Sequence, residues 1–267
     1  MLLERTYIAL VALLSVDLSG AESSDKIEAF AGEVPTVSAR SSSINCEIDL
    51  QKERFAIHVP ANYNGSQSFG LIVFIPASDQ TARVPSGWDK VLEERQLLLV
   101  IPQRALNSLD GATRLGLGVV AAQKMQERYR IDRHRVYAAG ISGGARAACR
   151  LGFYQSDLFR GTIQSCGADF PRAVPRVKAV PLDQDHGQDY GVIKASEMEV
   201  RQAREDVRFV IITGPGDFRY GNLLDIYYGG FNQDGFKATL IDIPEMKHEV
   251  CSGETLRRAL DFLDSSL

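Results

Sequence analysis

The residues with the clearest chemical meaning surround Ser142, in the run Gly140-Ile141-Ser142-Gly143-Gly144. An apolar run, a serine flanked by glycines and a helical pattern together have the form of a strand, a sharp turn and a helix. Positions two before and two after the serine must lack bulky side chains, because the chain passes close to itself at such a turn. A serine hydroxyl is a poor nucleophile until a base takes its proton. The motif therefore predicts a nucleophile if a base and an acid lie beside it.

The chain supplies a base and an acid later, in the order serine, acid, histidine that is typical of hydrolases with this kind of turn. Asp217 follows an apolar run through a Gly-Pro-Gly turn, and His248 follows the last apolar run. We expect His248 to be the general base and Asp217 to orient its imidazole ring. The competing acids and histidines are Asp183, Asp185, Asp189, Asp225, His134 and His186.

An oxyanion formed during attack by Ser142 needs at least two hydrogen-bond donors. The backbone N–H of Gly143, at the start of the helix after the turn, is one by geometry. The second is expected from the loop after the apolar run 71–75, where Pro76 has no N–H to donate. The candidates are the N–H groups of Ala77 and Ser78, with Ser78 slightly ahead.

Short apolar runs alternate with amphipathic helical patterns along most of the chain. The runs predict strands at 71–75, 97–101, 135–139, 161–165, 207–212 and 238–243. The last helical stripe joins Leu256, Ala259, Leu260 and Leu263, with Ser252 placed to cap it. This pattern predicts an α/β protein with a mostly parallel, doubly wound sheet. Ser142, Asp217 and His248 all fall at carboxyl ends of predicted strands, where such sheets carry their sites.

Two segments before these runs alternate apolar and polar residues. Ile44–Leu50 and Phe55–Val59 are predicted to form an antiparallel hairpin at the edge of the sheet. His58 falls on the face opposite the apolar residues of its segment. We expect it to be an exposed strand histidine with a structural role.

Length and composition favour one domain, assigned to residues 44–267. The chain has 267 residues, of which 45% are apolar and 24% charged, with a net charge of −4 and a pI near 5.7. No basic patch indicates a nucleic-acid partner or an anionic membrane surface. The sequence does not predict the oligomeric state.

The N-terminal residues are expected to direct export. Residues 1–21 have an apolar stretch too short for a membrane span, followed by small residues that suit signal-peptide cleavage. Residues 22–43 are rich in serine and alanine and are predicted to be a flexible leader. The mature protein is then expected to be soluble in the periplasm or outside the cell, and otherwise to be cytoplasmic.

The cysteines give no sign of a metal site. The chain has four, without a Cys-x-x-Cys pair, and they are Cys46, Cys149, Cys166 and Cys251. No metal or other cofactor is predicted. If the protein is exported, Cys166 and Cys251 are candidates for a disulfide, and buried free thiols are the equal alternative.

The stretch from residue 168 to 206 is longer than an ordinary crossover between strands. We interpret it as an insertion that acts as a partial lid or substrate wall. Tyr190, Phe218 and Tyr220 are candidates for contacts with an apolar or phenolic group of the substrate. Packing within the insertion is the alternative role for these rings.

Several motifs resemble a family of α/β-hydrolase esterases that includes polyhydroxybutyrate-depolymerase-like and feruloyl-esterase-like proteins. The motifs are Tyr129-Arg130-Ile131-Asp132, the Ser142 turn, Asp157-Leu158-Phe159-Arg160-Gly161 and Pro244-Glu245-Met246-Lys247-His248-Glu249. The resemblance spans roughly residues 55 to 265 and implies an α/β-hydrolase fold, with Ser142, Asp217 and His248 as the triad of a carboxylic ester hydrolase. The chain departs from the family where Pro76-Ala77 replaces a His-Gly pair and Ile141 replaces a histidine.

Two alternative functions stay open at this level. The same triad on the same fold supports a peptidase or amidase, because fold does not fix function. The altered Pro76-Ala77 loop also leaves room for an inactive binding protein on a hydrolase scaffold.

Overall fold

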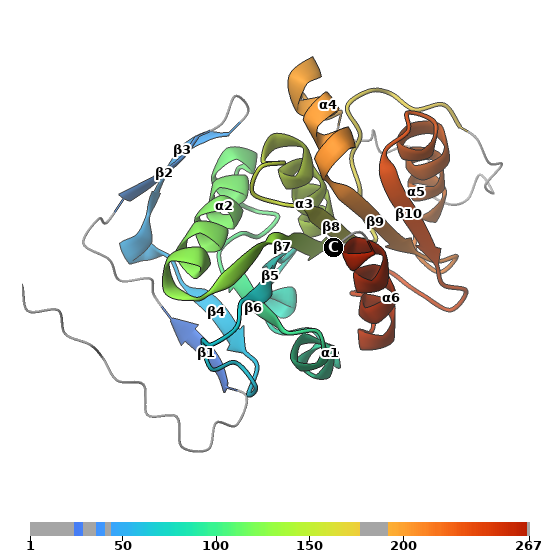
Figure 1. Ribbon diagram of the computed structural model, residues 1–267. Helices are drawn as coiled ribbons and strands as arrows, with labels where there is room; N and C mark the ends of the chain where they lie inside the picture. Colours follow the sequence, from blue (N-terminus) through green and yellow to red (C-terminus); the bar gives the residue numbers. More distant parts are fainter. Residues whose placement is uncertain (1–23, 29–35, 41–43, 177–191, 266–267) are drawn as a thin grey trace, which may run out of the picture.

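A mixed sheet forms the centre of the molecule (Figure 1). The computed structural model describes residues 24–28, 36–40, 44–176 and 192–265. Within these residues the main sheet has eight strands in the order β1-β4-β6-β5-β7-β8-β9-β10. Strands from β6 to β10 run parallel, β4 is antiparallel to β6, and β1 is antiparallel to β4. The predicted fold class, an α/β protein with a mostly parallel, doubly wound sheet and an antiparallel N-terminal edge, is confirmed.

The strands of the main sheet are β1 (Ser24–Glu28), β4 (Phe55–Val59), β5 (Phe69–Ile75), β6 (Leu97–Pro102), β7 (Ile131–Ile141), β8 (Gly161–Ser165), β9 (Arg208–Thr213) and β10 (Lys237–Asp242). A separate two-stranded sheet pairs β2 (Thr36–Arg40) with β3 (Asn45–Asp49) and packs on helix α2. All six strands that the apolar runs predicted are present, with ends shifted by at most a few residues.

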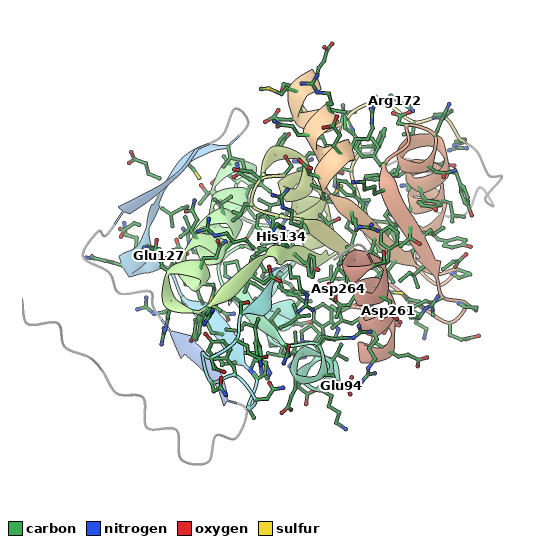
Figure 2. All side chains as sticks on the ribbon, viewed as in Figure 1. Glu94, Glu127, His134, Arg172, Asp261 and Asp264 are labelled. Carbon is green, nitrogen blue, oxygen red and sulfur yellow. The ribbon has the colours of Figure 1, made fainter. Side chains whose placement is uncertain are left out.

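Helices cover both faces of the sheet. They are α1 (Trp88–Glu94), α2 (Gly111–Arg128), α3 (Gly143–Tyr154), α4 (Glu197–Asp206), α5 (Tyr220–Ile226) and α6 (Gly253–Asp264). Helices α1 and α6 share one face, and the other four lie on the opposite face. Glu94 of α1 and Asp261 of α6 join the two helices of the first face through ion pairs with Arg257 and Arg95 (Figure 2).

The core follows from the two-residue period of the strands. In β5, for example, Leu71 and Val73 pack toward α2 and α3, whereas Ile72 and Phe74 pack toward α1 and α6. Every residue of β5 and β6 is buried, as expected of strands covered on both faces. The sheet is therefore a rigid platform whose carboxyl edge carries the loops of the site.

The N-terminal edge differs from the sequence prediction. Residues 45–49 pair with β2, so they do not form a hairpin with β4, and β1 is the antiparallel partner of β4. Both β1 and β2 lie inside the 22–43 range that we expected to be a flexible leader. Edge pairing uses backbone N–H and C=O groups that every residue but proline offers, so a segment poor in apolar residues gives little sign of it.

Strand β1 also changes the setting of His58. The prediction of an exposed histidine is wrong, since the residue is only 2% exposed. It pairs in register with Asp25 on one side and Leu99 on the other, so β4 is an internal strand. Alternation within a strand shows which face a residue occupies, but not whether a helix or loop covers that face.

The predicted signal peptide lies outside the described residues, and export stays a prediction. In the described part of the chain, no helix combines the length and the apolar character needed to cross a membrane.

Candidate active site

Ser142 lies on the sharp turn between β7 and α3 that the glycine motif predicted. Its backbone has φ 54° and ψ −119°, a conformation that residues with a side chain rarely adopt. A Cβ on Gly140 would collide with the backbone of Gly144, and one on Gly144 would collide with the carbonyl oxygen of Ile75. The glycines are therefore required because the turn and the start of α3 pack directly against the chain.

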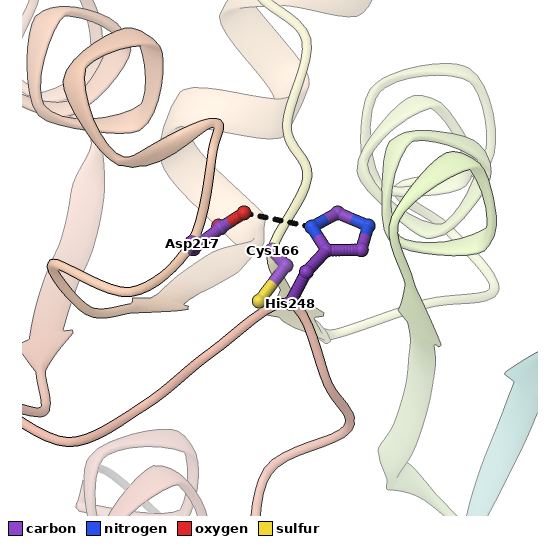
Figure 3. A group of neighbouring side chains, drawn as sticks. All are labelled: Cys166, Asp217 and His248. Carbon is purple, nitrogen blue, oxygen red and sulfur yellow. Dashed lines mark hydrogen bonds and ion pairs between the residues drawn. The ribbon is translucent and has the colours of Figure 1, made fainter. Parts of the chain in front are cut away.

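Asp217 and His248, which we call the dyad, meet at the carboxyl ends of β9 and β10. The Nδ1 atom of His248 lies 2.7 Å from Oδ1 of Asp217 (Figure 3). Backbone contacts hold the loop after β9 against the loop after β10. The N–H of Gly216 donates to the carbonyl of Met246 at 3.1 Å, and Gly216 forms an isolated β-bridge with Lys247. The side chain of Asp217 is fully buried, whereas that of His248 is 25% exposed.

Further hydrogen bonds hold the carboxylate of Asp217. Its Oδ2 accepts from the hydroxyl of Thr213 at 2.9 Å, and its Oδ1 accepts from the backbone N–H of Arg219 at 3.0 Å. Burial by itself raises the pKa of Asp217, but the hydrogen bonds from His248, Arg219 and Thr213 outweigh it and hold this pKa below its ordinary value. The carboxylate is therefore ionised, and it accepts a hydrogen bond from the Nδ1–H group of the imidazole.

Residues 165–167 connect the Ser142 turn to the dyad. The N–H of Ser142 donates to the carbonyl of Ser165 at 2.9 Å, and a Cβ on Gly167 would collide with the Ser142 carbonyl. Between them Cys166, which also has φ 54°, places its sulfur within 4.8 Å of the nearest ligand atoms of Asp217 and His248. The serine and the dyad thus lie on two sides of one short, tightly packed segment.

Cys166, Asp217 and His248 are all residue types that can bind a metal, but their states favour another role. Burial, together with the charge of Asp217, raises the pKa of the Cys166 thiol, and a thiolate is the form that binds zinc. The sulfur contacts the carbonyls of Lys247 and Glu249 at 3.4 and 3.5 Å. Cys166 therefore braces the loop on both sides of His248. All four cysteines are free thiols, so the Cys166–Cys251 disulfide is absent from the structure.

The candidate oxyanion donors have different surroundings. Gly143 begins α3 beside Ser142, as expected. The N–H groups of Ala77 and Ser78, however, both donate to Oγ1 of Thr81, at 2.9 and 3.0 Å. Because both N–H groups already donate to the same oxygen, their hydrogen bonds do not favour Ser78 over Ala77 as the second donor.

Asn107 is a site residue that the sequence analysis missed. A Cβ on Gly143 would collide with Oδ1 of the Asn107 side chain, so the amide lies directly against the start of α3. The backbone N–H of Asn107 also donates to the carbonyl of Ala77 at 3.0 Å. Asn107 follows β6, a strand end to which we had assigned no role, and only its position beside Gly143 reveals it.

The aromatic candidates separate into different roles. Phe218 is 46% exposed and stacks on the His248 ring, with centroids 4.2 Å apart. Tyr220 instead donates its hydroxyl to Asp242 at 2.7 Å, and burial and this carboxylate raise the pKa of Tyr220 to about 12. Tyr190 lies outside the described residues. Of the two described candidates, Phe218 is therefore the exposed ring that lies beside His248.

Two of the six competing acids and bases fall within the described residues, and both lie away from the dyad. Asp225 is buried within α5, and His134 is exposed near the start of β7, away from the carboxyl edge (Figure 2). Asp183, Asp185, His186 and Asp189 lie outside the described residues.

Two cavities open beside the site. One, of about 300 Å³, is lined by Ser142, Gly143 and Asn107 among others. The other, of about 880 Å³, is lined by Ile141, His248 and residues of the loop that precedes α1. Ser142 therefore lines the smaller cavity, and its neighbour Ile141 lines the larger one.

Comparisons with known proteins agree on the fold alone. No protein-family model matches the sequence, and no curated protein is significantly similar to it. A fluorophosphonate-binding serine hydrolase of Staphylococcus aureus matches with a TM-score of 0.57 and 15% identity, over 85% of this chain and 96% of the other.

Two further solved structures are similar. A ferulic acid esterase of the anaerobic fungus Anaeromyces mucronatus has a TM-score of 0.54 at 18% identity, over 88% of each chain. A poly(3-hydroxybutyrate) depolymerase of Bordetella parapertussis has a TM-score of 0.54 at 16% identity, over 80% of this chain and 85% of the other. Together with the strand order and the position of the Ser142 turn, these matches identify the α/β-hydrolase fold in this chain.

Proposed function

We propose that this protein is a serine hydrolase that cleaves a carboxylic ester through an acyl-enzyme intermediate. The observation that carries the proposal is the 2.7 Å hydrogen bond between His248 Nδ1 and the buried Asp217 carboxylate. This bond commits Nδ1 and leaves Nε2 to accept a proton, as the general base of a triad requires. The strained turn that presents Ser142 supports the same assignment.

In the first half of the reaction, Ser142 Oγ attacks the carbonyl carbon of the ester and His248 Nε2 takes the hydroxyl proton. Gly143 N–H, with Ala77 N–H or Ser78 N–H, stabilises the oxyanion. The bond from the carbonyl carbon to the alcohol oxygen then breaks, and His248 returns the proton to that oxygen. Asp217 stabilises the imidazolium throughout without taking the proton itself.

In the second half, water attacks the acyl group on Ser142. His248 takes a proton from this water and delivers it to Ser142 Oγ as the acyl bond breaks. The carboxylic acid leaves and the enzyme returns to its starting state. No step needs a cofactor from outside the chain.

Covalent labelling with a fluorophosphonate probe tests the nucleophile. We expect one adduct on the wild-type protein, located on Ser142 by peptide mass spectrometry, and none on the Ser142→Ala variant. A matched control is Ser86→Ala, because Ser86 is exposed and lines the larger cavity but does not lie on the glycine turn after β7. Labelling of Ser142→Ala, or of neither protein, would contradict the assignment.

Turnover of short-chain 4-nitrophenyl esters, compared with the matching anilides, tests the reaction class. We expect the esters to react and the anilides to be much slower, since an amine must be protonated to leave whereas an activated alkoxide needs less help. Faster turnover of the anilides would favour a peptidase or amidase.

A further inference from the structure

Four arginines surround the smaller cavity beside Ser142. They are Arg114 of α2, Arg146 and Arg150 of α3, and Arg219 of the loop after β9. Arg146 and Arg150 follow Ser142 at four-residue steps, so they share one face of α3 with the nucleophile's turn. Among the described residues that line this cavity there is no carboxylate. We call this space the arginine cavity.

The carboxylate of Asp169 pairs with two of these arginines, Arg146 and Arg150. Arg146 Nε donates to Oδ1 of Asp169 at 2.7 Å, and Arg150 Nε donates to Oδ2 at 2.6 Å. Asp169 is fully buried, while the two arginine side chains are 28% and 31% exposed. The carboxylate thus fixes the Nε edges of both guanidinium groups and offsets only one of the two charges.

Arg114 and Arg219 add two further guanidinium groups to the lining of the arginine cavity. Arg114 is buried and donates to the carbonyls of Pro76 at 2.6 Å and Ala105 at 2.8 Å. Arg219 lies over the ring of Phe218, with 5.4 Å from its guanidinium carbon to the ring centroid. Backbone carbonyls hold Arg114 in place, so its positive charge has no carboxylate among these contacts in the part of the chain that the structure describes.

The positive charges of Arg146 and Arg150 disfavour the charged form of Arg114. Burial, followed by the charges of Arg146 and Arg150, lowers the pKa of Arg114 to about 10. The guanidinium still carries its charge at neutral pH. Gathering like charges beside a nucleophile costs free energy of folding, and an anion bound between them would recover it.

We propose that the arginine cavity binds an anionic group, a carboxylate or a phosphate, of the ester that Ser142 attacks. This inference rests on the proposed function, because the cavity becomes a substrate subsite only if Ser142 is the nucleophile. Guanidinium groups bind carboxylate and phosphate oxygens through paired N–H donors, and they are already oriented here by Asp169 and by backbone carbonyls. The cavity volume of about 300 Å³ suits a small group of this kind.

A pair of substrates that differ only in charge tests this inference by kinetics. Mono-4-nitrophenyl adipate ends in a carboxylate, and 4-nitrophenyl adipamate has the same length but ends in a neutral amide. We expect kcat/KM to be at least about tenfold higher for the anionic ester, mostly through KM, with the preference shrinking as salt is added. Equal kcat/KM values for the two esters would overturn the proposal.

Arg219→Gln is the informative variant, because it leaves the ion pairs of Asp169 intact. We expect it to reduce the preference for the anionic ester by about fivefold or more. The matched control is Arg257→Gln, an exposed α6 arginine that pairs with Glu94 on the other face of the sheet. It should keep the full preference. An unchanged preference in Arg219→Gln would remove that residue from the subsite and count against the proposal.

Calorimetric titration of Ser142→Ala separates this inference from the proposed function, since it needs no turnover. The probes are monoethyl adipate, ethyl adipamate and monobutyl phosphate. We expect the two anions to bind at least about tenfold more tightly than the amide, and the tighter of the two identifies the preferred group. Selective anion binding without hydrolysis by the wild type would sink the proposed function alone. Hydrolysis of both esters without selective binding would sink the anion subsite alone.

Discussion

The dyad and the oxyanion loop, residues 76–81, differ in how far their polar groups are ready for the proposed reaction. In the dyad, each hydrogen bond on Asp217 orients the carboxylate toward the imidazole. In the oxyanion loop, the N–H groups of Ala77 and Ser78 converge on the hydroxyl of Thr81, an oxygen of the chain itself. The base half is therefore preorganised, whereas the oxyanion half holds its donors on an internal acceptor.

If the proposed mechanism holds, this difference indicates where hydrogen bonds must change during the reaction. The dyad can act without rearrangement, because its loops are tied together by backbone bonds. An oxyanion that uses Ala77 or Ser78 must compete with the Thr81 hydroxyl, which is a neutral and weaker acceptor than an anion. Successive backbone N–H groups that converge on one point are a recognised anion-binding arrangement. The N–H groups of Ala77 and Ser78 therefore already point at one position, as two donors to an oxyanion would.

The largest effect is expected from the dyad. Asp217→Asn keeps the size of the side chain but removes the charge that selects the Nδ1–H tautomer. We expect kcat to fall by about 10⁴-fold with the fold intact, as measured by ester turnover and circular dichroism. The control is Asp242→Asn, because Asp242 is exposed at the end of β10 and only accepts from Tyr220. A loss below about tenfold would show that the dyad is not the working base.

The next effect is expected at Gly143, on the oxyanion side. In Gly143→Ala the new methyl group must displace the Asn107 side chain or shift the start of α3. We expect kcat to fall by about 10²-fold or more, because the Gly143 N–H moves away from the oxyanion. Adding Asn107→Ala to this variant makes room for the methyl group and should restore part of the rate. A double variant no faster than Gly143→Ala would mean that the collision is not the cause.

The free energy of unfolding should depend on pH because of the hydrogen bonds that Asp217 accepts. Because the folded-state pKa of Asp217 is lowered, its contribution is complete above the unfolded-state value near 4 and is lost as the pH falls through the folded-state value. The free energy of unfolding should differ between wild type and Asp217→Asn by about 1–3 kcal/mol at neutral pH. Urea titrations at several pH values should show this difference shrinking below pH ~4. A difference that stays constant with pH would contradict the prediction.

The smallest effect is expected at Thr81. Thr81→Val removes the internal acceptor and keeps the shape of the side chain, so the N–H groups of Ala77 and Ser78 become available. We expect kcat for an activated ester to rise by about two- to fivefold, which corresponds to less than ~1 kcal/mol. A large fall in kcat at unchanged melting temperature would show instead that the hydroxyl positions the loop for catalysis.

The sequence predicts the elements of this fold well where burial sets the pattern. Short, mostly β-branched apolar runs favour strands covered on both faces, and this pattern is clearest in β5 and β6, where every residue is buried. Ser142, Asp217 and His248 were found because strand ends, turn glycines and residue order all constrain the same positions. The structure brings Asp217 and His248 together, and their roles with Ser142 remain our proposal.

Features that depend on spatial neighbours were not predictable. The pairing of β1 with β4 uses backbone groups alone, and the burial of His58 depends on what covers its face of the sheet. The Thr81 hydroxyl accepts bonds from residues whose order along the chain gives no sign of it. The arginine cavity collects side chains from α2, α3 and the loop after β9, and no local motif connects them.

The side chain of Cys166 excludes water from the space beside the dyad. Its sulfur fills the volume beside the Asp217–His248 hydrogen bond, and it is fully buried. A water molecule there would solvate the carboxylate and raise the local dielectric constant, weakening its attraction for an imidazolium. A thiol is bulky and only a weak hydrogen-bonding group, so it excludes that water while competing little for the carboxylate. The cysteine thereby keeps the electrostatic field of Asp217 directed at the ring that carries the proton in the proposed mechanism.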